Sequence, residues 1–123
     1  MESNFIAIHH TSYIVADVKR STFFYHSILG LEIDSSRPDF PFDGLWLNIN
    51  SSQQIHLICL ENPDPLERPI HGGRDRHTAF KVKDLSIVIL QLDQHKIAYT
   101  LSQSGRRALF CRDPDGNTLE IME

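Results

Sequence analysis

Apolar and polar positions alternate in the same order twice along the chain. Residues 10–18 (HTSYIVADV) and 77–85 (HTAFKVKDL) both begin with His-Thr, alternate like a half-buried β-strand and then reach an aspartate. A helical pattern follows each aspartate, DVKRSTFFYHSILG in the first copy and DLSIVILQLDQHK in the second. Asp17 and Asp84 are therefore the expected N-caps, and Gly30 is the expected C′ residue of the first helix.

Short strand patterns, separated by turn signals, follow each predicted helix. They are LEIDSS, LWLNI and QIHLICL in the first half, and IAYTLSQ, RRALFCR and NTLEIME in the second. The sequence DPDG at 113–116 is a strong turn signal before the last strand. This order predicts an α+β fold of two βαβββ modules, at about residues 5–62 and 75–123, within a single domain spanning residues 1–123.

Two segments lack periodicity. Residues 61–75, ENPDPLERPIHGGRD, are rich in proline and glycine and are expected to form a linker or loop between the modules. Residues 35–44, SSRPDFPFDG, combine proline with phenylalanine. Two interpretations of this second segment stay open, a mobile loop over a site or a surface loop whose phenylalanines pack into the core.

Charge, apolar runs and cysteine spacing indicate which classes of partner and which compartment to expect. A formal net charge of -4 argues against a nucleic-acid-binding surface. No apolar run is long enough to span a bilayer, and the N-terminal MESNFIAI lacks the features of a signal peptide, so we expect a cytoplasmic protein without a membrane partner. Cys59 and Cys111 have no CxxC spacing and are expected to be buried, reduced thiols.

The adjacent histidines His9 and His10 are distinguished by the repeat. Neighbouring residues of a strand point to opposite faces, so only one of the two can belong to a given site. The repeat places His10 opposite His77 and His9 opposite Arg76. We therefore expect His10 and His77 to be equivalent in the two modules, and His9 to be structural.

The last strands of the two modules supply two more candidates. Aligning QIHLI with TLEIM makes His56 the counterpart of Glu120, each between apolar neighbours that point the other way. If the halves pack with pseudo-twofold symmetry, His10, His56, His77 and Glu120 converge. Three imidazoles and one carboxylate suit a divalent transition metal (Ni, Zn, Fe, Co or Mn).

The other histidines lack this symmetry. His26 and His95 lie near predicted helix C-termini, where a histidine interacts favourably with the helix dipole. His71 falls in the segment between the modules and is not expected to bind the metal.

The stretches HTSYIVADVKRSTFFYHSILGLE, QIHLICL, RHTAFKVKDL and FCRDPDGNTLEIME resemble the vicinal oxygen chelate superfamily. This is the group of glyoxalase I, fosfomycin and bleomycin resistance proteins, and extradiol dioxygenases. The resemblance implies a cup-shaped mixed sheet around a metal, with ligands matching His10, His56, His77 and Glu120. It also implies a homodimer. In many members the first two of these ligands come from one chain and the last two from the other, but the sequence does not choose between swapped and unswapped pairing.

The resemblance also implies a reaction. Superfamily members chelate neighbouring oxygens of a small substrate on a metal that acts as a Lewis acid. A glyoxalase I-like lyase or isomerase needs a base that moves a proton beside a carbonyl, and Glu120 matches that role. A thiol conjugate is then one candidate substrate. His56 stands where glyoxalase I usually has glutamate, which removes a possible second carboxylate base.

Three alternatives remain. An extradiol-type dioxygenase would use His10, His77 and Glu120 as a facial triad for Fe(II). A thiol transferase acting on fosfomycin needs cations and hydroxyls around a phosphonate, for which the candidates are Ser104, Arg106, Arg107 and Arg112. A resistance protein that binds or sequesters a drug without turnover is the non-enzymatic alternative, and such members generally lack the ligand set.

Overall fold

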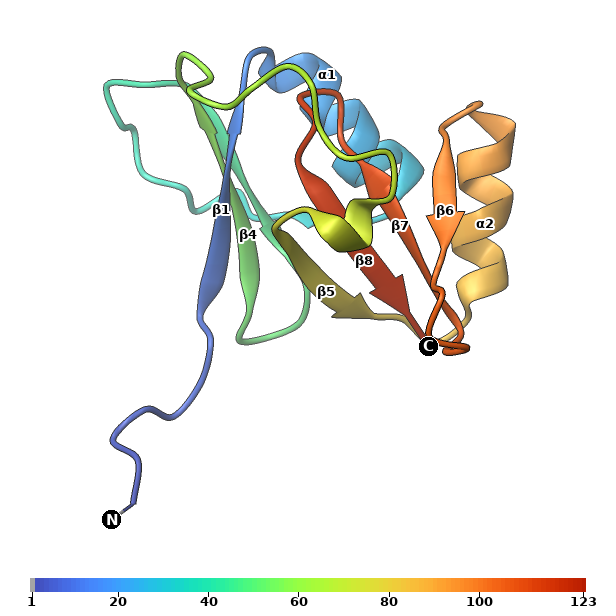
Figure 1. Cartoon of the computed structure of the whole chain (residues 1–123). Helices are drawn as coiled ribbons and strands as arrows, with labels where there is room; N and C mark the ends of the chain where they lie inside the picture. Colours follow the sequence, from blue (N-terminus) through green and yellow to red (C-terminus); the bar gives the residue numbers. More distant parts are fainter. Residues whose placement is uncertain (1) are drawn as a thin grey trace.

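The strands form two four-stranded sheets in the computed structural model, which describes residues 2–123 (Figure 1). The first sheet has the order β1-β4-β3-β2 and contains β1 (His10–Val15), β2 (Glu32–Ile33), β3 (Gly44–Asn48) and β4 (Gln54–Cys59). The second has the order β5-β8-β7-β6 and contains β5 (His77–Lys81), β6 (Tyr99–Leu101), β7 (Ala108–Arg112) and β8 (Thr118–Met122). The parallel pairs are β1 with β4 and β5 with β8, which are the first and last strands of each sheet along the chain. The other pairs are antiparallel. The predicted α+β fold of two βαβββ modules is confirmed.

The helices begin where the aspartates predict. The Asp17 carboxylate accepts from the Lys19 backbone N–H at 2.9 Å and caps α1 (Val18–Thr22), and the Asp84 carboxylate accepts from the Ser86 N–H at 2.9 Å and caps α2 (Leu85–Gln94). Gly30 has a φ of +80° just after the first helix, as a C′ residue requires.

The first helix changes from α-helical to π-helical geometry after its first turn. It continues from α1 into the π-helical segment η1 (Phe23–Ile28), in which the Leu29 N–H donates to the Phe24 carbonyl at 3.0 Å. Phe24, Tyr25 and Ile28 of this segment are all buried. An apolar pattern over so few residues does not distinguish α from π geometry, so the sequence did not predict the change.

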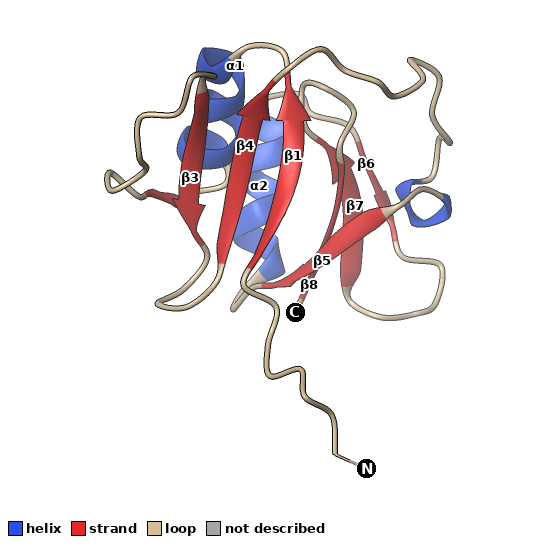
Figure 2. Ribbon diagram, turned by 90° about the vertical axis from the view of Figure 1, so that its left-hand side faces the viewer, coloured by secondary structure: helices blue, strands red, loops and turns tan. Residues whose placement is uncertain are grey.

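One apolar core joins the two modules. Both helices lie behind β3, β4 and β1 in Figure 2. The buried cluster takes side chains from both sheets and both helices: Val15, Phe24, Tyr25, Ile28, Leu47, Ile55, Leu57, Leu85, Leu92, Leu109, Cys111, Leu119 and Ile121. Each sheet therefore turns one face toward this common core. The opposite face of each sheet, here called its outer face, carries the candidate chemistry.

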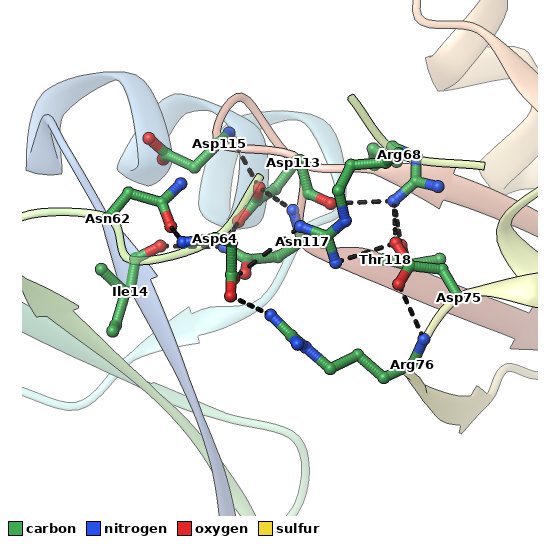
Figure 3. Close-up of polar contacts among 12 residues, drawn as sticks. Ile14, Asn62, Asp64, Arg68, Asp75, Arg76, Asp113, Asp115, Asn117 and Thr118 are labelled. Carbon is green, nitrogen blue, oxygen red and sulfur yellow. Dashed lines mark hydrogen bonds and ion pairs between the residues drawn. The ribbon is translucent and has the colours of Figure 1, made fainter. Parts of the chain in front are cut away.

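The β7–β8 turn fixes module 2 to module 1. Asp113 is only 5% exposed, and its carboxylate accepts from the Tyr25 hydroxyl at 2.7 Å and from the Asn117 side-chain amide at 2.9 Å. The backbone N–H groups of Asp115 and Asn117 also donate to it, and the Asn117 amide reaches the Ile14 carbonyl of β1 (Figure 3). Burial raises the pKa of Asp113, against the effect of these hydrogen bonds. The predicted turn thus has a second role as a contact between modules.

The segment at 61–75, here called the connecting segment, packs over the second sheet. It contains the 3₁₀ turn η2 (Gly72–Arg74), which lies on the outer face of β7 and β8. A Cβ at Gly72 would lie 2.7 Å from Thr118 Cγ2 and 3.0 Å from Phe110 Cβ, so only glycine permits this approach. The connecting segment is therefore part of the architecture of module 2.

The phenylalanines of residues 35–44 lie on the outer side of the first sheet. Phe40 stacks on Phe42 with ring centroids 5.2 Å apart and lies 6.3 Å from the Trp46 ring. Arg37 lies over Phe40 at 5.0 Å and donates to the Phe42 carbonyl at 3.0 Å. Neither phenylalanine belongs to the buried core cluster, so the interpretation in which they pack into the core is wrong.

Both cysteines are free thiols, as the sequence predicts, but only Cys111 is buried, so the prediction of burial is wrong for Cys59. Burial, assisted by the Asp113 charge, raises the pKa of Cys111 to about 12, whereas Cys59 is half-buried. We expect a thiol reagent at pH 8 to modify Cys59 alone in the native protein and both cysteines after denaturation. Spectrophotometric titration of thiols measures this, and rapid native modification of both would contradict it.

No helix within residues 2–123 combines the length and apolar character needed to cross a bilayer.

Candidate metal centre

The first two candidate ligands lie side by side on the outer face of the first sheet. Parallel pairing places His10 opposite Gln54 and Ser12 opposite His56. The imidazole rings of His10 and His56 stack with centroids 3.9 Å apart and an interplanar angle of 17°. The equivalent register in module 2, His77 opposite Thr118, confirms the alignment of the repeat. Two nitrogen donors are thus neighbours on rigid strands.

Trp46 extends this stack and was missed by the sequence analysis. It pairs with His56 across β3 and β4, and the two rings lie 4.3 Å apart and 6° from parallel. His56 Nε2 also lies 2.9 Å from the Gln54 side-chain oxygen. The available signal was the position of Trp46 in LWLNI, one residue from Leu45 and Leu47 and hence on the opposite face.

Burial keeps His56 neutral. Desolvation, followed by the charges of His10 and His9, lowers the pKa of His56 to about 4. The Gln54 side-chain oxygen can only accept, so Nε2 of the neutral His56 ring carries the proton and Nδ1 is the nitrogen that offers a lone pair to a metal near pH 7.

His9 lies closer to the candidate centre than the repeat predicts. Its Nδ1 is 2.9 Å from Nδ1 of His10, and the two rings meet edge to face. The expectation that His9 points away is not met, because β1 begins at His10 and strand alternation does not extend to residue 9. One Nδ1 must donate to the other, and when His10 is the donor its Nε2 keeps the lone pair that a metal ligand needs.

The other two candidates form a pair on the outer face of the second sheet. His77 Nε2 lies 3.2 Å from Oε1 of Glu120, and Glu120 is 4% exposed. His77 Nδ1 lies 2.8 Å from the Asp75 carbonyl oxygen, which can only accept, so Nδ1 carries a proton. In the neutral ring Nε2 then presents a lone pair to a carboxylate oxygen. Two lone pairs at this distance require a proton or a cation beside them, and a divalent metal fits that requirement.

Arg106 occupies the second oxygen of Glu120. Its Nη2 donates to Glu120 Oε2 at 3.1 Å, while its Nε donates to the Ser104 hydroxyl at 3.1 Å. Of the other arginines considered for phosphonate binding, Arg107 pairs with Glu123 and Arg112 pairs with Asp75. Of these three arginines, Arg106 is therefore the one that contacts Glu120.

The two pairs do not meet within one chain. Among residues 2–123 no group of three or more His, Cys, Asp or Glu side chains lies close enough to hold a metal ion. The core faces of both sheets pack into the common core, so the outer faces with the two pairs are turned away from it. Convergence of all four ligands inside one chain, which pseudo-twofold packing suggested, is not observed.

The remaining histidines make local hydrogen-bond contacts. His26 Nδ1 lies 2.7 Å from the Leu31 carbonyl, and His95 Nδ1 lies 2.9 Å from the Gln91 carbonyl, both at helix ends as predicted. His71 Nδ1 lies 2.7 Å from the Thr100 hydroxyl. None of the three contacts a candidate ligand through these bonds.

Comparison with known proteins identifies relatives along nearly the whole chain. Residues 7–121 match the family described as the Glyoxalase/Bleomycin resistance protein/Dioxygenase superfamily. The chain is 31% identical to the uncharacterized protein YaeR of Escherichia coli (strain K12), over 94% of this chain and 95% of YaeR. It is 33% identical to the uncharacterized protein YwkD of Bacillus subtilis (strain 168), over 95% and 96% of the two chains.

Solved structures share the fold. A putative glyoxalase family protein from Bacillus anthracis superposes with a TM-score of 0.76 at 21% identity, over 98% of this chain and 97% of that one. The trypanothione-dependent glyoxalase I of Leishmania major superposes with a TM-score of 0.73 at 24% identity, over 97% and 87%.

Proposed function

Because the chain belongs to the glyoxalase/bleomycin resistance protein/dioxygenase superfamily, we propose that it is a metal-dependent, glyoxalase I-like lyase or isomerase. The observation that carries this proposal is the contact between His77 and Glu120. There a buried carboxylate faces an imidazole nitrogen whose ring is already fixed at its other nitrogen. The proposed metal is Ni, Zn, Fe, Co or Mn.

We further propose that the centre forms between two copies of the chain. Each chain carries two ligand pairs on separate outer faces, and neither pair is a sufficient shell for a transition metal. In a twofold dimer the His10–His56 pair of one subunit meets the His77–Glu120 pair of the other, which completes two equivalent centres. This is the swapped arrangement that the sequence left open.

The residues then have separate tasks. A bound divalent ion would polarise two neighbouring oxygens of the substrate and favour negative charge developing on them. His10, His56 and His77 hold the ion, and Trp46 restrains the His56 ring by stacking. Glu120 takes the proton from the carbon that bears the hydroxyl and the thiol sulfur and returns it to the adjacent carbonyl carbon, while the hydroxyl proton moves to the former carbonyl oxygen. A hemithioacetal is thereby isomerised to a 2-hydroxy thioester with all atoms retained.

Metal analysis and activity measurements test the proposal together. Protein purified without a histidine tag is expected to hold stoichiometric metal and to lose thermal stability with a chelator. Methylglyoxal–glutathione hemithioacetal should turn over with at least one of the five metals. Catechol with Fe(II), and fosfomycin with thiol, test the two alternative enzymes. Absence of both metal and a chelator effect would overturn the proposal.

Trp46 provides an internal probe for the metal. It is the only tryptophan of the chain, and its ring lies on His56. We expect added Ni²⁺ to quench Trp46 fluorescence saturably, because a paramagnetic ion at the His10–His56 pair lies next to the indole. His56→Ala should remove the saturable part and His95→Ala should retain it. Equal quenching in the two variants would place the ion elsewhere.

Mixing two inactive variants tests the swapped pairing. His10→Ala and Glu120→Gln each damage a different ligand pair. In a mixed dimer with swapped centres, one centre carries both changes and the other carries neither. Random subunit exchange is therefore expected to restore about a quarter of wild-type activity, since half of the dimers are mixed. No recovery after verified exchange would indicate unswapped centres.

A further inference from the structure

We propose that Asp75 is a positioning residue that fixes the ring of His77 through its own backbone carbonyl. This inference rests on the proposed function in one respect, since it treats His77 as a metal ligand. The contact itself does not depend on a metal. The Asp75 carbonyl oxygen lies 2.8 Å from His77 Nδ1, two residues further along the chain.

Asp75 is itself held from several sides. Its carboxylate accepts from Arg68 Nη2 at 2.8 Å and from Arg112 Nη1 at 2.7 Å, and the Thr118 hydroxyl lies 3.4 Å away. Its other oxygen accepts from the Arg76 backbone N–H at 2.9 Å. Figure 3 shows the side chains of Arg68 and Asp75 directed toward one another beside Thr118. The Asp75 side chain is only 12% exposed, so these contacts are largely shielded from water.

The two arginines come from different elements, one before module 2 and one within it, and are anchored separately. Arg68 belongs to the connecting segment, is 10% exposed and also pairs with Asp64 at 3.7 Å. Arg112 belongs to β7 and donates to the carbonyls of Pro69 and Gly116 as well. Charge-assisted hydrogen bonds with several fixed donors restrict a carboxylate to one orientation. Asp75, two residues before β5, is thereby tied to both β7 and the connecting segment.

This arrangement determines which nitrogen of His77 is free. Because Nδ1 is occupied as a donor, Nε2, which faces Glu120 at 3.2 Å, is the nitrogen of His77 that can bind a metal. The hydrogen-bond partner of the non-ligating nitrogen generally fixes tautomer and ring orientation at metal sites. The connecting segment, which contains no candidate ligand, therefore contributes to the centre through Asp75.

The test compares Asp75→Ala with Asp64→Ala. Both changes remove a carboxylate that pairs with Arg68 in the connecting segment. Asp75→Ala keeps the backbone carbonyl that contacts His77 but releases it from its anchors, whereas Asp64 also pairs with Arg76 and makes no contact with His77. Nitrogen-15 NMR of the metal-free protein reports the His77 tautomer, and calorimetry with Ni²⁺ reports affinity. Asp75→Ala is expected to lower the Nδ1-protonated population and weaken Ni²⁺ binding about 10–100-fold, whereas Asp64→Ala changes neither.

The outcomes separate this inference from the proposed function. A tautomer change in Asp75→Ala without Ni²⁺ binding in the wild type would support the positioning role and overturn the metal centre. An unchanged tautomer, or equal changes in the two variants, would overturn the positioning role. If Asp75→Ala does not fold, Asp75→Asn, which keeps the size of the side chain, is expected to shift the tautomer in the same direction, and no shift there is equally decisive.

Discussion

Glu120→Gln is expected to reduce metal-dependent turnover at least about 10³-fold while the fold is retained. The amide has almost the same volume as the carboxylate, but it cannot take a proton and brings no charge to the ion. Arg106 loses its carboxylate partner at 3.1 Å, and the oxygen facing His77 Nε2 is no longer anionic. Steady-state kinetics, with circular dichroism to verify folding, measures the effect.

Two comparisons distinguish this role from a general charge effect. Glu123→Gln makes the same chemical change at the exposed partner of Arg107 and should leave turnover unchanged. His77→Ala should weaken metal binding about 10–100-fold, whereas His9→Ala should retain activity, since His9 is not an expected ligand. Equal metal affinity in the Glu120, His77 and His9 variants would be incompatible with the assigned centre.

Asp113→Ala should produce the largest loss of stability, about 3 kcal/mol in the free energy of unfolding. The change leaves the Tyr25 hydroxyl, the Asn117 amide and two backbone N–H groups without their shared acceptor. These groups lie where the β7–β8 turn meets module 1, so both modules are affected. Urea denaturation measures the loss.

Tyr25→Phe is the matched control, because it removes one hydrogen bond to the same carboxylate and should cost about 1 kcal/mol. An Asp113→Ala effect no larger than that of Tyr25→Phe would contradict the idea of a shared acceptor.

Asp113 also makes the free energy of unfolding depend on pH in a defined direction. Burial raises the pKa of Asp113 above its usual 3.8, so the folded protein binds this proton more tightly than the unfolded chain does. The contribution of Asp113 protonation to stability is therefore lost as pH rises through the raised pKa and is regained as pH falls toward 3.8. As the pH is lowered from the raised pKa toward 3.8, the free energy of unfolding of the wild type should increase relative to that of Asp113→Asn.

The sequence predicted the features that depend on local order. These are the N-caps Asp17 and Asp84, both helices, the turn at 113–116 and the equivalence of His56 with Glu120, which follow from local patterns and from an internal repeat that the sequence itself displays. The π-helical segment was missed because its apolar side chains fit either helical geometry.

Features that join distant residues were not predictable in the same way. The repeat shows that His10 and His77 are equivalent, but not that the sheets share a core and leave the two ligand pairs apart. The contact of Tyr25 with Asp113 and that of Arg68 with Asp75 depend on how the modules and the connecting segment dock. The Trp46–His56 stack requires the register of β3 against β4, which alternation alone does not supply.

The division of the ligands into two pairs has a thermodynamic consequence under the proposed dimer. Metal binding and dimerisation become linked equilibria. If the bound ion strengthens dimerisation by a given factor, dimerisation strengthens binding of the ion by the same factor. Dilution then releases metal, and metal depletion releases subunits. The cellular concentration of the chain would set its metal occupancy as directly as the supply of the ion does.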